Sequence, residues 1–168
     1  MADLIEMKLT GLDGVLDTLK SLPPEVVSKR GGPVKAALRK GALVILKAER
    51  QALQIATANA TDSGKRESTG FLLKNLIASR GKAPTTGKGE RYLVRVRRKS
   101  YPDRTGKPVT TLKTAQLLEY GSSQQPAEPW IRPAFLRNAR LTIETIERET
   151  VRAVERVAAK LGAANKGK

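Results

Sequence analysis

Side chains able to do acid–base or metal chemistry are scarce in this sequence. It contains no histidine and no cysteine, which removes the commonest general base, the commonest metal ligand and all thiol chemistry. Asp13 and Asp17 have the spacing of a carboxylate pair on one helix face. No further carboxylate cluster supports them as a metal site, and a solvated helix face explains them more simply.

Candidates for a catalytic nucleophile or a phosphate-binding loop are equally scarce. Ser122 and Ser123 follow Tyr120 and Glu119, but no base accompanies them, and a turn explains them better than a nucleophile does. None of the patterns GxxxxGK[ST], GxGxxG or GxSxG occurs, so phosphate-binding and nucleophile-elbow motifs are absent. We therefore predict a protein that is not an enzyme and that needs no cofactor or metal.

Positive charge is the dominant chemical feature of the chain. Lys and Arg outnumber Asp and Glu by 32 to 16, a formal net charge of +16. The excess is concentrated in residues 59–110, with thirteen basic and four acidic side chains. Such an excess favours contact with a polyanion, whether nucleic acid, an acidic protein surface or anionic lipid.

The densest basic stretch is RYLVRVRRKS, residues 91–100. Its alternation predicts a strand with Tyr92, Val94 and Val96 on one face. The cations available to a DNA channel or an acidic partner are Arg91, Arg95, Arg97, Arg98 and Lys99. A phosphate-binding surface and a solvated strand face that discourages edge pairing both remain open. Sequence-specific nucleic-acid recognition is not expected, because no stacking aromatics and no known DNA-binding module appear.

Rigid and aromatic side chains gather in EYGSSQQPAEPWIRPAF, residues 119–135, which we call the elbow. Prolines fix φ and push the preceding residue out of the α region, so the elbow should be a stiff, extended connection. The last proline suits the first turn of a following helix, and the aromatics supply a hydrophobic anchor. The elbow either attaches that helix to its own sheet or presents its loop to another subunit. The residues concerned are Pro126, Pro129, Trp130, Pro133 and Phe135.

Hydrophobic periodicity predicts the elements that position these residues. Strands are expected over residues 4–11, 91–99 and 110–120, and helices over 12–22, 33–58, 71–80 and 131–161. Gly41, inside the second helix, is best explained by close packing. The last helix should bury a continuous stripe: Leu136, Ala139, Ile143, Ile146, Thr150, Val154, Val157 and Leu161.

This order of elements predicts an α+β fold, in which helices pack on a small antiparallel sheet of three or more strands and a long C-terminal helix completes the chain. We expect one domain over residues 1–161, flexible basic loops near 59–68, 81–90 and 100–110, and a disordered basic tail at 162–168. A helix as long as 131–161 exceeds what one small core needs, which favours packing on a neighbouring subunit. The longest apolar run, 42–46, is too short for a membrane span, and the acidic N-terminus is unlike a signal peptide, so we expect a soluble intracellular protein without a membrane partner.

The elbow resembles an element of the neck and tail-completion (minor tail component) proteins of long-tailed phages. In that family a strand ending in Glu-x-Gly leads through a proline-rich link into a helix that begins with Arg-Pro-Ala. The matching residues are Glu119, Gly121, Pro126, Ala127, Pro129, Trp130, Arg132, Pro133 and Ala134. The order of the other elements is similar as well, but the loops near 59–68 and 100–110 resemble the family less, and the resemblance implies nothing about them.

The resemblance implies a structural virion protein at the head–tail junction, a neck or tail-completion ring subunit assembled in the host cytoplasm. It would join tail to head around the DNA channel. Its partners would be copies of itself, neighbouring head-closure, tail-terminator or tail-tube proteins, and packaged DNA through non-specific contact. The alternative from charge alone is a non-specific nucleic-acid-binding protein.

Overall fold

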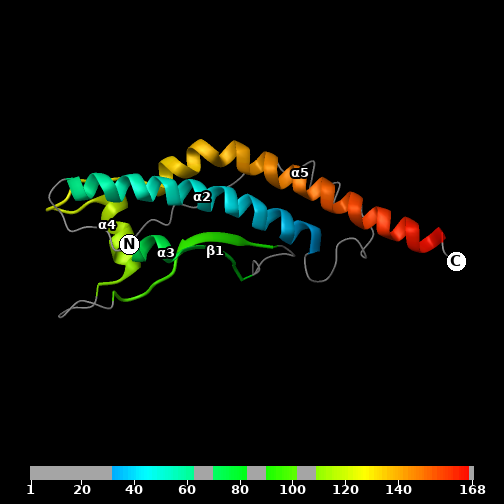
Figure 1. Cartoon of the computed structure of the whole chain (residues 1–168), viewed down its shortest axis with the longest axis horizontal. Helices are drawn as coiled ribbons and strands as arrows, with labels where there is room; N and C mark the ends of the chain where they lie inside the picture. The colour runs from blue at the N-terminus through cyan, green and yellow to red at the C-terminus, as the bar shows by residue number, and fades with distance from the viewer. Residues whose placement is uncertain (1–31, 63–69, 83–89, 102–108, 167–168) are drawn as a thin grey trace.

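The computed structural model describes residues 32–62, 70–82, 90–101 and 109–166. Two long helices, α2 (Gly32–Asp62) and α5 (Ile131–Lys166), lie side by side and run in opposite directions (Figure 1). At 1.5 Å per residue they are about 46 and 54 Å long. The far end of α5 extends past the start of α2 (Figure 1).

The other elements pack beneath α2. They are the single turn α3 (Phe71–Lys74), strands β1 (Leu76–Arg80) and β2 (Tyr92–Val96), and helix α4 (Thr111–Tyr120). The strands pair antiparallel, with Leu76 opposite Val96 and Ala78 opposite Val94. These four side chains pack on the core, whereas Leu93 and Arg95, which lie on the opposite face of β2, are exposed. The α+β prediction, with a small antiparallel sheet and a long C-terminal helix, is confirmed.

The predicted helix over 71–80 is wrong beyond its first turn. Asn75 ends that turn, because its side-chain amide donates to the Phe71 carbonyl (2.8 Å), and its own carbonyl accepts from the Arg97 N–H (2.8 Å). From that point the backbone pairs with β2. A short apolar run does not distinguish helix from strand, and here the strand opposite decides.

The predicted strand over 110–120 is also wrong, since residues 111–120 form helix α4. Thr110 caps its start by accepting from the Lys113 N–H. The buried residues Thr111, Ala115 and Leu118 recur at intervals of four and three, so one helix face meets the core. The described residues therefore form a two-stranded sheet. Outside these strands, Ser100 and Thr110 form an isolated antiparallel bridge.

Several predictions fall outside the described residues. The strand over 4–11, the helix over 12–22 and most of the loops near 59–68, 81–90 and 100–110 belong to this group. Two helices are longer than the sequence predicted. Helix α2 continues to Asp62, past the predicted end at residue 58, and α5 continues to Lys166, past the predicted end at residue 161.

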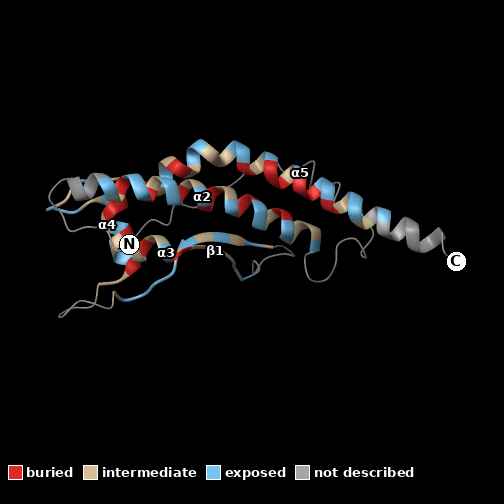
Figure 2. Cartoon of the chain, in the orientation of Figure 1, coloured by how far each residue is buried: buried red, intermediate tan, exposed pale blue. Residues whose placement is uncertain are grey.

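The main core lies at one end of the molecule, where α2, α3, the sheet and α4 meet the start of α5. It is aliphatic apart from a single aromatic residue, and consists of Leu46, Leu53, Ala56, Leu72, Leu76, Ala115, Leu118 and Trp130. Buried positions line the facing sides of the two long helices (Figure 2).

The contact between α2 and α5 is close because it is made by small residues. A methyl group at Gly41 would lie 2.5 Å from Cγ1 of Ile146, which confirms close packing as the reason for this glycine. The buried face of α5 also includes Ala134, Thr142 and Ala153. The predicted stripe holds at Ile146 and Thr150 but not at its start, because Leu136 is 70% exposed.

Candidate functional site

A carboxylate from α4 holds the first turn of α5. Glu119 is 2% exposed, and its Oε2 accepts the backbone N–H groups of Trp130 and Ile131, both at 2.8 Å. Its Oε1 accepts the N–H (3.3 Å) and the Nε (3.2 Å) of Arg132. Helix N-termini have unpaired N–H groups and a partial positive charge, so a buried carboxylate satisfies both. Glu119 is thus the cap of a helix that begins twelve residues later, at Ile131.

Gly121 lets the chain turn from α4 back towards this cap. Its φ of +73° is unfavourable for other residues, and a Cβ would lie 2.8 Å from both the Gln125 carbonyl oxygen and the Ala127 nitrogen. The Gly121 N–H closes α4 on the Leu117 carbonyl, and the Glu128 N–H donates to the Leu118 carbonyl at 2.7 Å. The Glu-x-Gly pattern therefore has a physical basis, since Glu119 caps α5 and Gly121 allows the return.

We expect Gly121→Ala to lower the free energy of unfolding by about 2–3 kcal/mol, from backbone strain and the clash with backbone atoms. Gly70 is a matched control, because its φ is also positive (+67°) but nothing lies within 4 Å of a Cβ there. Gly70→Ala should cost only about 1 kcal/mol. Urea denaturation of both variants measures the difference, and equal losses would contradict the role given to the close approach.

Trp130 is fully buried in the core of its own chain. Its indole Nε1 has no hydrogen-bond partner in the described part of the protein. Phe135 and Pro133 are half-buried in the first turns of α5, and Pro126 and Pro129 are exposed. The elbow thus attaches α5 to its own core through Trp130 and leaves Pro126 and Pro129 at the surface.

Arg132 connects the cap to the surface. Its guanidinium lies 5.5 Å from the centre of the Tyr120 ring, over its face, and its Nε binds Glu119. Both Arg132 and Tyr120 are substantially exposed, the tyrosine at 60%. A buried carboxylate and an exposed ring therefore orient this cation.

The five predicted cations of the basic strand are all exposed. Within the described residues none of them forms an ion pair, and the Arg95 Nε donates to the Ser79 hydroxyl at 3.0 Å. The Thr111 hydroxyl joins the strand end to α4, because it donates to the Arg97 carbonyl and accepts from the Lys99 N–H. The strand thus carries unneutralised positive charge on a surface separate from the elbow.

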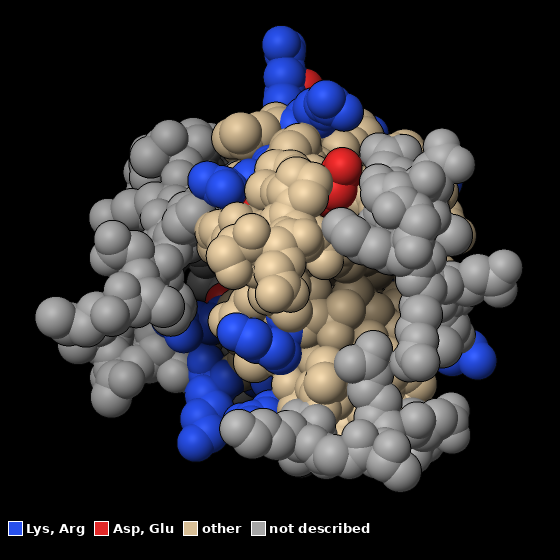
Figure 3. All heavy atoms as spheres, turned by 90° about the vertical axis from the view of Figure 1, so that its left-hand side faces the viewer, with Lys and Arg blue, Asp and Glu red and all other residues tan. Residues whose placement is uncertain are grey.

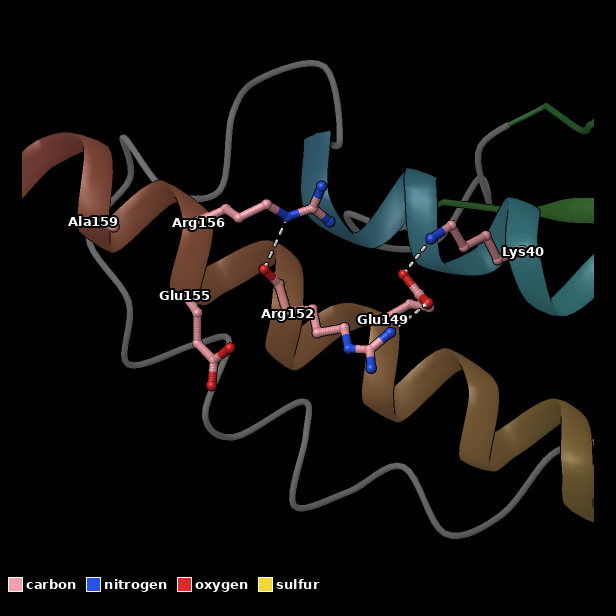
Figure 4. A pocket seen from close by; sticks show the side chains of 6 residues that line it. All are labelled: Lys40, Glu149, Arg152, Glu155, Arg156 and Ala159. Atoms are coloured by element: carbon pink, nitrogen blue, oxygen red, sulfur yellow. Dashed lines mark hydrogen bonds and ion pairs between the residues drawn. The ribbon is translucent and has the colours of Figure 1, made fainter.

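An open groove of about 540 Å³ lies where α2 and α5 separate, a feature that the sequence did not predict (Figure 4). Lys40 of α2 pairs with Glu149 of α5, which also lies 3.6 Å from Arg152. The Lys40 hydrogen bond lowers the pKa of Glu149. The Arg156 Nε donates to the Arg152 carbonyl at 3.1 Å (Figure 4). The charges here pair with one another across and along the helices, as expected of a helix–helix contact.

A second buried carboxyl group lies in the core-facing stripe of α2. Glu49 is 5% exposed, and burial, together with the charge of Glu119, raises its pKa to about 7. The sequence did contain the signal, because an acidic residue occupies a position of the apolar stripe between Leu46 and Leu53.

Acidic side chains do not gather into a metal site in the part of the chain that the structure describes. Over residues 32–62, 70–82, 90–101 and 109–166, no cluster of acidic side chains suits a metal ion. Ser122 forms a tight turn with Gln125, as predicted. Asp13 and Asp17 lie outside the described residues.

Comparisons with family models, with curated proteins and with solved structures found no match. Among the described helices, none combines the length and the apolar character needed to cross a membrane. The interpretation of function therefore rests on the chain's own residues and on the resemblance of its elbow.

Proposed function

We propose that this protein is a structural, non-enzymatic subunit of a phage particle, a neck or tail-completion protein that forms a ring at the head–tail junction. The observation that carries the proposal is the elbow. The residues that resemble the family's motif form one physical unit, in which Glu119 caps α5, Gly121 permits the return and Trp130 fills the core. Each of these residues thus has a structural role in this chain, although the segment that ends in Glu-x-Gly is helix α4 here and not the strand of the family's pattern.

Two further features support assembly. Helix α5 continues past the start of α2 (Figure 1), and several of its apolar side chains are exposed, with Leu141 at 48% and Val151 at 51%. A head-to-tail contact that closes by rotation gives a ring. The exposed cations of the basic stretch 91–99 would then face the DNA channel or an acidic neighbouring ring.

The test measures the oligomeric state of the purified protein, alone and mixed with head-closure, tail-terminator and tail-tube proteins. Mass photometry and negative-stain electron microscopy should show rings, or incorporation into tails or particles. A protein that stays monomeric at all concentrations and never joins particles would overturn the proposal.

A second candidate function, non-specific nucleic-acid binding, is favoured by the five exposed cations of the basic stretch 91–99, none of which forms an ion pair within the described residues. The variant Arg91→Ala/Arg95→Ala/Arg97→Ala should bind duplex DNA more weakly, and its slope of log K against log salt should fall by about 2–3, because each lost phosphate contact removes about 0.9. The control Arg140→Ala removes a charge on α5 that Glu144 already neutralises. Fluorescence anisotropy across a salt series measures the slopes of both variants, and equal slopes for all proteins would show that the basic stretch 91–99 does not contact DNA.

A further inference from the structure

A surface groove of about 460 Å³ lies on the outside of the elbow, at the start of α5. It is lined by Pro129, Arg132, Pro133, Leu136 and Arg137. Figure 3 views this end of the molecule, where uncharged residues form a central area bordered by Lys and Arg, with little acidic surface among the described atoms. None of its lining residues belongs to the basic stretch 91–99 or to the groove between α2 and α5.

The groove is rigid and partly apolar. Two prolines lie in its wall, and Glu119 fixes the backbone of the turn between them by accepting the N–H groups of Trp130 and Ile131. Leu136 is 70% exposed, so α5 does not use this side chain in its own core. A partner that covers it gains the free energy of apolar burial without reorganising the site.

The rim of the groove is cationic. Glu119 and Tyr120 hold Arg132 in place through its Nε and its ring contact, and its terminal Nη groups meet no acceptor in the described part of the chain. Arg137 is exposed and forms no ion pair there. None of the residues that line the groove is acidic. Oriented guanidinium groups recognise carboxylates with two parallel hydrogen bonds.

These features select one kind of occupant. The net charge of +16 on each copy disfavours a second copy at this cationic rim, so we place the contact between ring subunits on the exposed apolar side chains further along α5. A nucleic acid would gain little from Leu136 and the prolines. We infer that the groove binds a short acidic segment of a neighbouring protein, in which an apolar side chain covers Leu136 and carboxylates pair with Arg132 and Arg137.

The inference deepens the proposed function, on which it rests for the origin of the partner. The test uses a peptide and the full-length protein, without ring assembly, so the two proposals fail separately. If the protein forms rings but does not bind the peptide, only the inference about the groove is refuted. If the protein binds the peptide but does not assemble, only the proposal that it forms a ring is refuted.

The probe is a fluorescein-labelled peptide, Glu-Leu-Asp-Glu-Phe-Asp. Its controls are Gln-Leu-Asn-Gln-Phe-Asn, which lacks the charge, and Glu-Ser-Asp-Glu-Ser-Asp, which lacks the apolar anchors. We expect binding of the first peptide in anisotropy titrations, and at least tenfold weaker binding of each control. Both Arg137→Glu and Leu136→Ser should weaken binding of the first peptide at least fivefold, because each removes one part of the recognition.

Matched variants one turn further along α5 are Arg140→Glu and Leu141→Ser, whose side chains are also exposed. They should leave binding within twofold of the unmodified protein, and circular dichroism should show all four variants folded. Three results would overturn the inference: no binding at 1 mM peptide, equal effects of the groove and control variants, or self-association that Arg137→Glu abolishes while peptide binding is absent. Competition by oligothymidylate that depends on Arg137 but not on Leu136 would overturn it in favour of a nucleic acid.

Discussion

Replacing Glu119 with alanine is expected to lower the free energy of unfolding by about 1–4 kcal/mol, the combined cost of an unsatisfied buried donor and a lost charge at the start of α5. The carboxylate accepts three backbone N–H groups and the Nε of Arg132. Its loss leaves the Trp130 N–H, which is buried, without a partner. An unsatisfied buried donor costs about 1–3 kcal/mol, and the helix dipole loses its counter-charge as well.

Urea denaturation followed by circular dichroism measures this loss. Glu144→Ala is the matched control, because Glu144 is also a glutamate paired with an arginine, but half of its side chain is exposed. An exposed i,i+4 pair contributes about 0.3–0.5 kcal/mol. If the two variants lose the same stability, the capping role of Glu119 is refuted.

Replacing Glu49 with glutamine should remove most of the pH dependence of stability near neutrality. Burial and the nearby Glu119 raise the pKa of Glu49 from 4.5 to about 7, so between these values the folded protein holds a proton that the unfolded chain has lost. The free energy of unfolding contributed by this proton is complete below pH 4.5 and is lost as pH rises through 7. A shift of this size corresponds to about 3 kcal/mol.

The unmodified protein should therefore lose up to about 3 kcal/mol of stability between pH 4.5 and pH 8 through this group, and Glu49→Gln should lose far less. Above pH 7 the variant should be the more stable protein, because it keeps a neutral side chain beside Glu119. Urea titrations at pH 5, 6, 7 and 8 give the two profiles, and Glu144→Gln is the exposed control. Parallel profiles for the unmodified protein and Glu49→Gln would show that Glu49 ionises normally.

The long elements could be predicted from the sequence because their signal accumulates over many residues. Helix α2 repeats its apolar positions over several turns, and β2 alternates between Tyr92, Val94 and Val96 on one face and Leu93 and Arg95 on the other. The residues of the elbow could be singled out too, since three prolines, a tryptophan and a Glu-x-Gly pattern coincide there.

The short elements could not be predicted in the same way. Residues 76–80 have apolar spacing compatible with a helix, and only pairing with β2 makes them a strand. Residues 111–120 alternate as a strand would at Leu118 and Tyr120, but the buried positions Thr111, Ala115 and Leu118 belong to a helix that Thr110 caps. In segments of five to ten residues, contacts with distant parts of the chain outweigh local preference.

The register of α5 shows the same limit. Its helical period was evident, but a helix has several faces with apolar residues, and the sequence placed Leu136 on the buried one. The close approach of Gly41 to Ile146 instead brings Thr142, Ile146 and Glu149 towards α2. Leu136 is left exposed at the groove.

By itself, the sequence determined an α+β chain with two long helices, a basic strand and a stiff proline-rich elbow, because composition and periodicity are properties of neighbouring residues. It also determined the large positive charge and the lack of histidine and cysteine. Only the tertiary structure decided that Glu119 caps α5, that Trp130 belongs to its own core and that Leu136 faces outward with Arg137. These outcomes depend on which surfaces meet across the fold, and such contacts join residues that the local pattern does not relate.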